Sequence, residues 1–591
     1  MRHTRFAAQQ RGKQQGSHFS LSPPKDRMGW VLLAVLALGV VITGRLVMLQ
    51  VVHHGFYVAL AEGQYEKSEE LTPRRGELFL TSAHDEGTIP LAINRELYLL
   101  YAVPRDVEGI EETITKLKGY IDLDEDVLRE RLSKEGDLYE PLMHKVTPEQ
   151  KEAIEALALP GLRFLPEDER FYPEGRTSAH LSGFLGFSGD TRLGQYGLEG
   201  FFEEELAGEP GYLQAQQDAG GRLIPTGDRL FKSAVDGTDF VLTVDQSIQY
   251  FACTRLEEEV QRHGAVSGSV IIMDPSTGAI IAMCGAPSYD PNAYGDVKEI
   301  KVFRNAAVED VYEPGSVMKP ITMAAALDLG KVTPETTYED TGSVEIAGYT
   351  IRNADDKTYG VKNMTQVLEE SINTGAIFAA QQVGNEAFRT YMQRFGFGAA
   401  TGISLPGEHP GNISSLDNLH DLYTATASFG QGITATPLQL LQSFGAIANH
   451  GLMMKPYLIK ERITPSGHHI AAEPEEVRQV IQPKTASTLA GMLANVVING
   501  HGKKAGVEGY YIAGKTGTAQ VPDENGPGYD KDRTIGTFAG FGPVTDPAFV
   551  MVVKIDEPKT VQFAESTAAP LFGEIAEFLL QYYDIPPSRT P

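Results

Sequence analysis

The longest hydrophobic pattern in the chain is a single apolar run near its N-terminus. Residues 30–44 contain no charged side chain, and the run continues past Arg45 to Val52. About twenty apolar residues span a bilayer, so residues 29–52 are predicted to form one transmembrane helix, with Arg45 reaching the far interface. A signal peptide cleaved near Ala59-Leu60-Ala61 is the alternative, but this triplet lies too far from the apolar run.

The charges on either side of this run predict its orientation. The first 28 residues contain six Lys and Arg but only one Asp, so the positive-inside rule places this tail in the cytoplasm. The rest of the chain then lies outside the cytoplasmic membrane. The full 591 residues have a formal net charge of −27, which repels phosphate backbones and argues against nucleic-acid binding.

Periodicity divides the exported part into two regions. Residues 53–235 mix short strand-like runs with charged helical patterns, and no catalytic constellation is found among them. The turn signal Asp236-Gly237-Thr238 then precedes the alternating Phe240, Leu242 and Val244, which predicts a domain boundary. The predicted segments are a tail at 1–28, a transmembrane helix at 29–52, domains at 53–235 and 236–584, and a C-terminal tail at 585–591.

The second region has the pattern of a sheet interrupted by many helices. Two apolar runs on either side of Asp274-Pro275-Ser276-Thr277-Gly278 predict a pair of strands, and helical patterns dominate from 321 to 515. Two more strands and a closing helix are predicted at 537–541, 549–555 and 568–583. The order strands, helices, strands favours an α+β domain with an antiparallel sheet.

Cysteine and histidine offer little chemistry in this sequence. Cys253 and Cys284 are the only two cysteines, too few for a disulfide framework or a Cys-based zinc site, and they are interpreted as buried free thiols. The pairs His53-His54 and His468-His469 lack the spacing of metal ligands. No metal and no cofactor is predicted.

Candidate chemistry begins at Ser316 and Lys319. Gly315 permits a sharp entry into an apolar helical run, and residues three apart share a helix face, so the Lys319 amine is expected within reach of the Ser316 hydroxyl. A serine needs a base to act as a nucleophile, and a lysine serves when burial and nearby positive charge lower its pKa. This spacing alone is weak evidence, because Ser22-Pro23-Pro24-Lys25 has it too.

Two further motifs, Ser371-Ile372-Asn373 and Lys515-Thr516-Gly517-Thr518, follow in order. A positive charge and hydroxyls on one strand suit a substrate carboxylate, and Gly517 lets a backbone approach closely. The predicted roles are nucleophile for Ser316, base for Lys319, proton relay for Ser371, substrate-amide binding for Asn373, and carboxylate binding for Lys515, Thr516 and Thr518.

The order Ser-x-x-Lys, Ser-x-Asn, Lys-Thr-Gly is that of penicillin-binding proteins and serine β-lactamases. The sequence resembles the class B penicillin-binding proteins from the membrane segment to about Tyr583. The resemblance also rests on Arg170-Phe171-Tyr172-Pro173 and Gly197-Leu198-Glu199-Gly200 in the first region and on Gly430-Gln431-Gly432 in the second. It implies an elongated, non-catalytic α/β pedestal of the dimerisation type, then a transpeptidase domain with helices on both sides of its sheet.

This resemblance also implies an activity and partners. It implies a peptidoglycan D,D-transpeptidase that cross-links stem peptides through a serine acyl-enzyme, binds β-lactams as inhibitors, and has an oxyanion hole formed by the backbone N–H groups of Ser316 and Thr518. Glu313-Pro314-Gly315 and the segment 554–559 look more like the division-type, septal enzyme than the elongation-type one. A membrane glycan polymerase and divisome proteins are the implied partners.

The sequence departs from the family pattern twice. Arg75-Gly76-Glu77-Leu78 lacks the usual following Asp-Arg-Asn-Gly turn, and Gly500-His501-Gly502 replaces Gly-Thr-Gly.

A β-lactamase normally carries a Glu-x-x-Leu-Asn segment that is not found in this sequence, and a β-lactam sensor has more membrane helices. The alternatives are an elongation-type enzyme, a β-lactam-hydrolysing or β-lactam-sensing relative, and a non-enzymatic scaffold. Asp355 and Asp356 are interpreted as part of a charged loop without a role.

Overall fold

The computed structural model describes residues 26–54, 66–85, 87–189, 191–216, 229–523, 526 and 528–588. The predicted basic tail up to residue 25, the triplet at 59–61 and residues 589–591 lie outside these ranges. The chain forms two compact units, one of residues 1–71 with 210–233 and one of residues 72–209 with 234–591. Each unit is described by itself.

The predicted apolar run is helical in the first unit. Helix α1 (Arg27–Val47) continues as the π-helical turn η1 (Met48–Val52), and none of its side chains is buried. Asp26 caps the helix by accepting the Gly29 N–H at 3.0 Å. The helix from Arg27 to Val52 is long and apolar enough to cross a membrane, which fits a single-pass membrane protein. An antiparallel sheet completes the unit, with strands β1 (Glu66–Leu71), β8 (Gly211–Gln216) and β9 (Arg229–Lys232).

The first sheet of the second unit has seven strands. Its order is β19-β18-β10-β2-β3-β4, with β5 paired to β3, and only the β10–β2 pair is parallel. Strands from both sides of residue 236 therefore share one sheet. The bounds are β2 (Leu78–Thr81), β3 (Ile89–Ala102), β4 (Glu140–Val146), β5 (Leu162–Phe171), β10 (Asp239–Asp245), β18 (Ile459–Ile463) and β19 (His469–Ala471).

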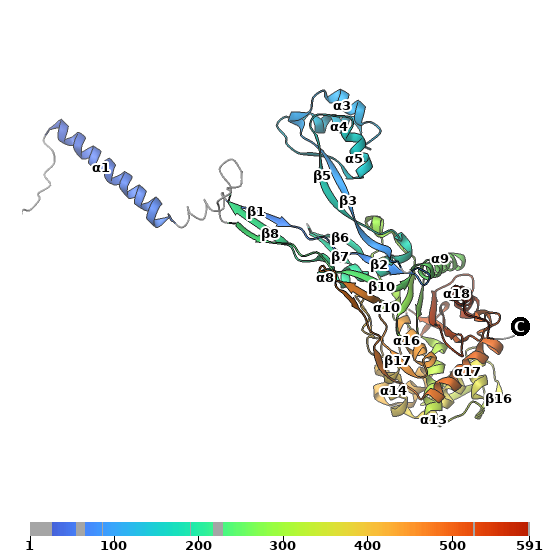
Figure 1. Ribbon diagram of the computed structural model, residues 1–591. Coiled ribbons are helices and arrows are strands. Elements are labelled where there is room, and N and C mark those ends of the chain that lie inside the picture. The colour runs from blue at the N-terminus through green and yellow to red at the C-terminus, as the bar shows by residue number, and fades with distance from the viewer. Residues whose placement is uncertain are drawn as a thin grey trace, which may run out of the picture. The chain divides into compact units, whose positions relative to one another are not determined.

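A small helical subdomain packs on the far end of β3 and β5 (Figure 1). It contains α3 (Ile110–Leu117), α4 (Glu125–Leu132) and α5 (Pro148–Glu155) around a separate apolar core. The sequence predicted the first two of these helices from their charged amphipathic patterns. Closer to the rest of the unit lie the hairpin β6 (Phe184–Ser188) and β7 (Thr191–Gln195) and the short helices α6 (Ala179–Ser182), α7 (Gly197–Phe201) and α8 (Glu203–Ala207).

A buried ion network explains the charged residues of the pedestal motifs. Glu199 is fully buried and accepts from Arg75 at 2.6 Å and from Arg170 at 2.7 Å. Burial alone would raise the pKa of Glu199, but the two guanidinium groups lower it below its usual value. The neighbouring Tyr172 N–H donates to Asn292 Oδ1 at 3.0 Å, which connects this network to the C-terminal region.

A five-stranded antiparallel sheet forms the centre of the C-terminal region, in the order β12-β11-β23-β22-β21. Its central strands are buried on both faces because helices cover both; all eight residues of β23 are buried. The α+β class with an antiparallel sheet, expected from the sequence, is confirmed. The bounds are β11 (Ser267–Met273), β12 (Ile280–Ala286), β21 (Ala513–Pro522), β22 (Tyr529–Gly542) and β23 (Phe549–Asp556).

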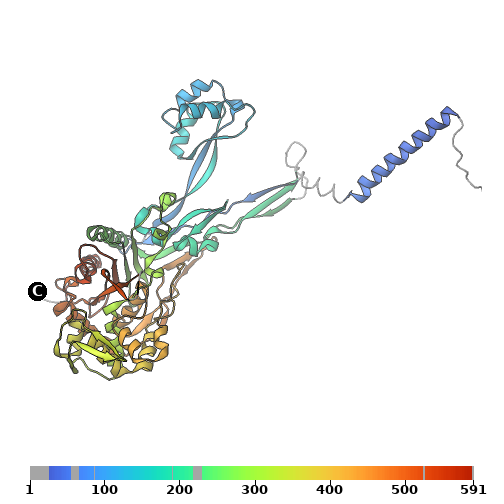
Figure 2. The same ribbon diagram turned by 180° about the vertical axis from the view of Figure 1, so that it is seen from behind.

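Helices α9 (Gln246–His263) and α18 (Ala568–Tyr582) cover one face of this sheet. On the other face lies α16 (Pro437–Ala448), all of whose residues are buried; Thr436 and Gln439 close its N-terminus as a capping box. Figure 2 shows the helices of this region, coloured green to red, gathered around the sheet. The remaining longer helices are α11 (Lys319–Asp328), α12 (Met364–Glu369), α13 (Asn373–Val383), α14 (Asn385–Arg394), α15 (Asp421–Ala427) and α17 (Pro483–Asn499).

Short helices and two-stranded pairs complete the second unit. The helices are η2 (Pro104–Asp106), η3 (Gly175–Ser178), η4 (Pro291–Asp296), η5 (Ile300–Phe303), α10 (Ala306–Glu309), η6 (Gly315–Met318), η7 (Ser414–Asn418), η8 (Lys503–Ala505) and η9 (Ala564–Ser566). The strands are β13 (Thr337–Asp340), β14 (Ser343–Ile346), β15 (Tyr349–Arg352), β16 (Gly360–Asn363), β17 (Leu452–Met454) and β20 (Glu476–Gln479).

The prediction of two free thiols is wrong. Cys253 on α9 and Cys284 on β12 form a disulfide with a Cα–Cα separation of 5.2 Å. The two residues are 31 positions apart and have no local pattern in common. The packing of α9 against β12 brings them together, and the bond fastens this helix to the edge strand of the central sheet.

Candidate active site

Ser316 lies in a tight turn that the sequence before it prepares. Gly315 has a left-handed φ of +61°, which favours glycine, and its N–H donates to the Gly430 carbonyl at 3.1 Å. Residues 315–318 form the 3₁₀ turn η6, and the α-helix α11 begins only at Lys319. The sequence predicted that Ser316 begins the α-helix itself. In the structure a 3₁₀ turn precedes the α-helix, and Ser316 lies half-buried in this turn.

Ser371 occupies a position after a helix where glycine is common. It follows α12, its N–H donates to the Leu368 carbonyl, and the next N–H, of Ile372, donates to the Val367 carbonyl. These two bonds define a Schellman motif, whose residue after the C-cap is left-handed; Ser371 has a φ of +56°. A serine held in this sparsely populated conformation is typical of functional sites. The turn directs Ser371 toward the two lysines of the other motifs.

Lys515 extends from β21, an edge strand of the central sheet. The strand lies directly against the turn of Ser316. A Cβ added to Gly517 would lie only 2.8 Å from the Pro314 carbonyl oxygen. Lys515 is completely buried. Its Nζ donates to Ser371 Oγ at 2.9 Å, to the Thr516 carbonyl at 3.0 Å and to Thr516 Oγ1 at 3.4 Å.

Lys319 reaches the same serine from the opposite side. Its Nζ donates to the Ser371 carbonyl and, at 3.2 Å, to Ser371 Oγ. Among the described side chains, Lys319 is therefore hydrogen-bonded to Ser371 and not to Ser316, the residue from which the sequence argument started. Ser371 Oγ accepts from both lysines, so the three motifs meet at this atom.

Burial decides the protonation of both lysines. Burial, and secondly the positive charge of Lys515, hold the pKa of Lys319 well below its usual range, although Asp355 partly offsets them. Burial alone lowers the pKa of Lys515 to about 7. A lysine with a lowered pKa supplies a neutral amine at physiological pH, which is the form that accepts a proton.

A cavity of about 220 Å³ gives access to these groups. Four of the predicted residues line it: Ser316, Ser371, Thr516 and Thr518. Lys319, Lys515, Gly517 and Asn373 lie buried beside it. The Asn373 side chain donates to the Arg352 carbonyl at 3.0 Å, and Thr518 Oγ1 accepts the Ala564 N–H at 3.1 Å.

Several cavity residues were not found from the sequence. Asp355, read as part of a charged loop, lines the cavity, accepts the Tyr359 hydroxyl at 2.7 Å and pairs with Lys357 at 3.0 Å. Burial opposes ionisation of Asp355, but the hydrogen bonds from Tyr359 and Lys357 lower its pKa. No spacing rule connects such loop residues to the motifs. The others are Asn353, Ala354, Tyr359, Glu370, His501, Phe563 and Glu565.

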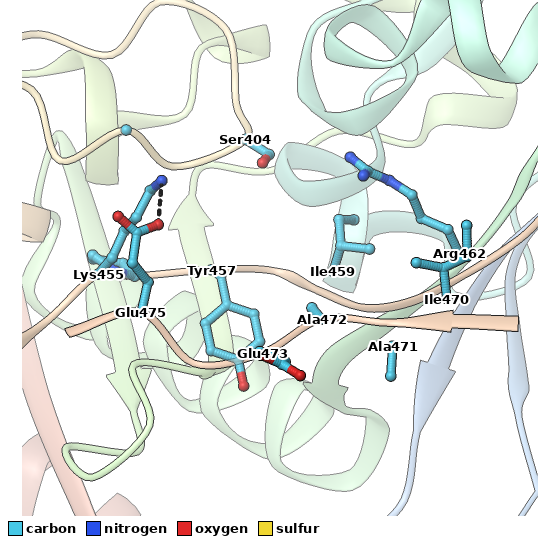
Figure 3. Close-up of a pocket in the computed structure, with 12 residues that line it drawn as sticks. Ser404, Lys455, Tyr457, Ile459, Arg462, Ile470, Ala471, Ala472, Glu473 and Glu475 are labelled. Carbon is cyan, nitrogen blue, oxygen red and sulfur yellow. Dashed lines mark hydrogen bonds and ion pairs between the residues drawn. The ribbon is translucent and has the colours of Figure 1, made fainter.

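A second, larger cavity of about 340 Å³ lies between the β18–β19 hairpin and residues 402–404 (Figure 3). Its Lys455 and Glu475 pair with each other at 2.8 Å, and Tyr457 and Arg462 also line it. Ser404 faces Arg462 and Ile459 across the cavity, without a buried lysine beside it. Among the described residues, no group of three or more His, Cys, Asp and Glu could hold a metal ion.

The chain matches two family models. Residues 268–577 match the penicillin binding protein transpeptidase domain, and residues 70–242 match the penicillin-binding protein dimerisation domain. The first model covers the central sheet and all three motifs. The second covers the strands β2 to β5 and the buried Glu199 network.

Relatives and solved structures agree with these models. Stage V sporulation protein D of Bacillus subtilis is 31% identical over 96% of this chain and 87% of that protein. Probable peptidoglycan D,D-transpeptidase PbpC of Pseudomonas aeruginosa is 31% identical over 95% of both. The apo crystal structure of penicillin binding protein 3 from Mycobacterium tuberculosis has a TM-score of 0.68 at 26% identity, over 88% of this chain and 98% of that one. The same protein has also been solved with aztreonam bound.

These matches confirm the resemblance that the motifs indicated and the fold that it implied. The chain belongs to the penicillin-binding protein family, as a class B member in which a dimerisation domain precedes a serine-type transpeptidase domain.

Proposed function

We propose that this chain is a peptidoglycan D,D-transpeptidase that joins stem peptides through an acyl-enzyme on Ser316. One observation carries the proposal: two buried lysines converge on Ser371 Oγ, in the wall of a cavity that also exposes Ser316. This arrangement supplies a nucleophile, a base and a proton relay within one site. The proposed catalytic residues are Ser316, Lys319, Ser371, Asn373 and Lys515.

The first half-reaction acylates Ser316. The donor's terminal carboxylate binds at Lys515, Thr516 and Thr518, and its scissile carbonyl enters the oxyanion hole of the Ser316 and Thr518 N–H groups. The Ser316 oxygen attacks the carbonyl carbon while neutral Lys319 accepts its proton. Collapse of the tetrahedral intermediate breaks the amide bond, and Ser371 passes a proton to the departing D-alanine amine.

The second half-reaction transfers the acyl group to an amine. The amine of a second stem peptide attacks the Ser316 ester, loses a proton to the Ser371 and lysine group, and forms the cross-link as Ser316 is released. Water is a poor competitor because the three carboxylates that line the described cavity are already engaged by other side chains. Asp355 pairs with Lys357, Glu370 with Lys362 and Glu565 with His501.

Benzylpenicillin distinguishes this function from its rivals. After incubation, the intact full-length chain in detergent is expected to gain the mass of one penicilloyl group, to keep it for hours, and to carry it on the peptide that contains Ser316. Rapid consumption of the drug without a lasting adduct would indicate a hydrolase. Neither adduct nor consumption would indicate a non-enzymatic scaffold.

The orientation in the membrane is part of the proposal. The basic residues ahead of the apolar helix support a cytoplasmic N-terminus, with domains at 53–235 and 236–584 outside the cytoplasmic membrane. The Cys253–Cys284 disulfide supports this orientation, because such bonds persist in oxidising compartments and are rare in the cytosol.

The proposed cellular role is septal cross-linking together with a membrane glycan polymerase and divisome proteins. Glu313-Pro314-Gly315 and the segment 554–559 support the division type over the elongation type. A fluorescent fusion to the N-terminal tail, made in the organism that encodes the chain, is expected to concentrate at the division site. An even distribution along the cell wall would favour the elongation type.

A further inference from the structure

The carboxylate of Glu313 joins two elements that border the catalytic cavity. Glu313 lies three residues before Ser316 and is half-buried. Its Oε1 accepts the Gly432 N–H at 2.9 Å, and its Oε2 accepts the Tyr529 hydroxyl at 2.8 Å. Each carboxylate oxygen therefore has one donor from a different segment. No step of the mechanism above uses this residue.

The first of these segments, residues 430–432, lies against the backbone of the Ser316 turn. The Gly430 carbonyl accepts the Gly315 N–H at 3.1 Å. A Cβ on Gly430 would lie 2.2 Å from the Gly315 carbonyl oxygen, so only glycine fits at this approach. The bond from the Gly432 N–H to Glu313 holds the far side of the same loop.

The second segment is the hairpin of β21 and β22. Tyr529 begins β22 opposite Pro522, and β21 carries Lys515, Thr516 and Thr518 in the same hairpin. Burial, then the hydrogen bond and charge of Glu313, raise the pKa of Tyr529, so its phenol stays protonated and donates. The Glu313–Tyr529 bond therefore fastens the end of this hairpin where β21 ends and β22 begins to the chain just before the nucleophile.

The separation between β21 and the Ser316 turn has a catalytic consequence. The proposed oxyanion hole takes one N–H from Ser316 on the turn and one from Thr518 on the strand. Preorganised donors stabilise a developing oxyanion only at hydrogen-bond distance from its final position. A small displacement of β21 relative to the turn would thus reduce the stabilisation of the transition state more than the affinity of the initial complex.

We propose that Glu313 is a positioning residue that sets the spacing of the oxyanion hole by fastening the β21–β22 hairpin and the 430–432 loop to the turn of Ser316. The inference rests on the proposed function and deepens it. Glu313 acts through Ser316 and Thr518 and does not touch the reacting atoms.

Four variants of the full-length chain test this role by the kinetics of benzylpenicillin acylation. Glu313→Ala removes both bonds and is expected to lower the acylation rate constant about 100-fold, as loss of one oxyanion donor does, with little change in the initial binding constant. Tyr529→Phe removes one of the two bonds and is expected to lower the acylation rate constant about 10-fold. Glu313→Gln is expected to retain most of the rate, because its amide oxygen accepts from Gly432 while its NH₂ donates to Tyr529.

Tyr391→Phe is the matched control. It also removes a tyrosine–carboxylate bond, from Tyr391 to Asp328 Oδ2 at 2.6 Å, but far along α11 from Ser316, and its acylation rate is expected to equal that of the wild type. A boronic acid that mimics the tetrahedral intermediate gives a second readout: its affinity is expected to fall in parallel with the acylation rate across the variants.

The inference is overturned if Glu313→Ala acylates at the wild-type rate, if Glu313→Gln is as slow as Glu313→Ala, or if only the initial binding constant changes. If Glu313→Ala does not fold, the acylation kinetics of Tyr529→Phe are compared with those of Tyr391→Phe by the same criteria. A wild-type chain that forms no adduct would remove the proposed function and this inference with it. Normal wild-type acylation with unaffected variants would remove only the inference.

Discussion

Replacement of Ser316 by alanine is expected to abolish the penicilloyl adduct, whereas replacement of Ser371 is expected only to slow its formation. The geometry offers two serines in one cavity, and the lysine contacts taken alone would favour Ser371. Ser371 Oγ, however, already accepts from Lys319 and Lys515. Ser316 lies on the 3₁₀ turn η6, beside the strand of Thr518. A carbonyl attacked by Ser316 would therefore have both proposed oxyanion donors close by.

Intact mass over time measures this difference. Ser371→Ala is expected to acylate about 10²–10³-fold more slowly than the wild type, the usual contribution of a proton-transfer group. Ser487→Ala is a suitable control, since Ser487 is exposed on α17 and bonds only to the Pro483 carbonyl among the described residues. A full adduct on Ser316→Ala, with none on Ser371→Ala, would reverse the two assignments.

Replacement of Lys319 by alanine is expected to lower the acylation rate by about 10³-fold or more, because it removes the general base. Lys319 is almost completely buried. Burial, and then the charge of Lys515, hold its pKa well below its usual range, so the amine is available as a base at neutral pH. Thermal unfolding of the variant, measured beside its acylation rate, separates loss of the base from loss of the fold.

The two lysines also predict the direction of the pH dependence. Acylation efficiency is expected to rise with pH while Lys319 loses its proton, because only the neutral amine accepts one. It is expected to fall above about pH 7, where Lys515 loses the positive charge that binds the carboxylate. In Lys515→Arg the alkaline fall should disappear, since a guanidinium keeps its charge. A profile that is flat through neutral pH in the wild type would contradict this assignment.

The local elements were largely predictable because they depend on neighbouring residues. The apolar run predicted a helix at 29–52, and the structure has one from Arg27 to Val52. Two apolar runs around Asp274 and Gly278 predicted β11 and β12. Motif order also predicted that Ser316, Ser371 and Thr516 belong to one site, and the structure places all three on one cavity wall.

Contacts between distant segments were not predictable in this way. His501 follows α17, whereas Phe563 and Glu565 lie at and within η9, after β23. No spacing in the sequence connects these residues with Ser316. The disulfide was missed for the same reason, because the distance between Cys253 and Cys284 depends on how α9 packs on β12.

The order of the elements, the apolar span and the family of the catalytic motifs follow from the sequence, since periodicity and spacing are properties of consecutive residues. Which atoms meet depends instead on the packing of distant segments. It placed Ser371, in a left-handed turn, between Lys319 and Lys515. It also set the pKa of each lysine, because desolvation depends on every segment that packs around the amine and not on its neighbours in the chain.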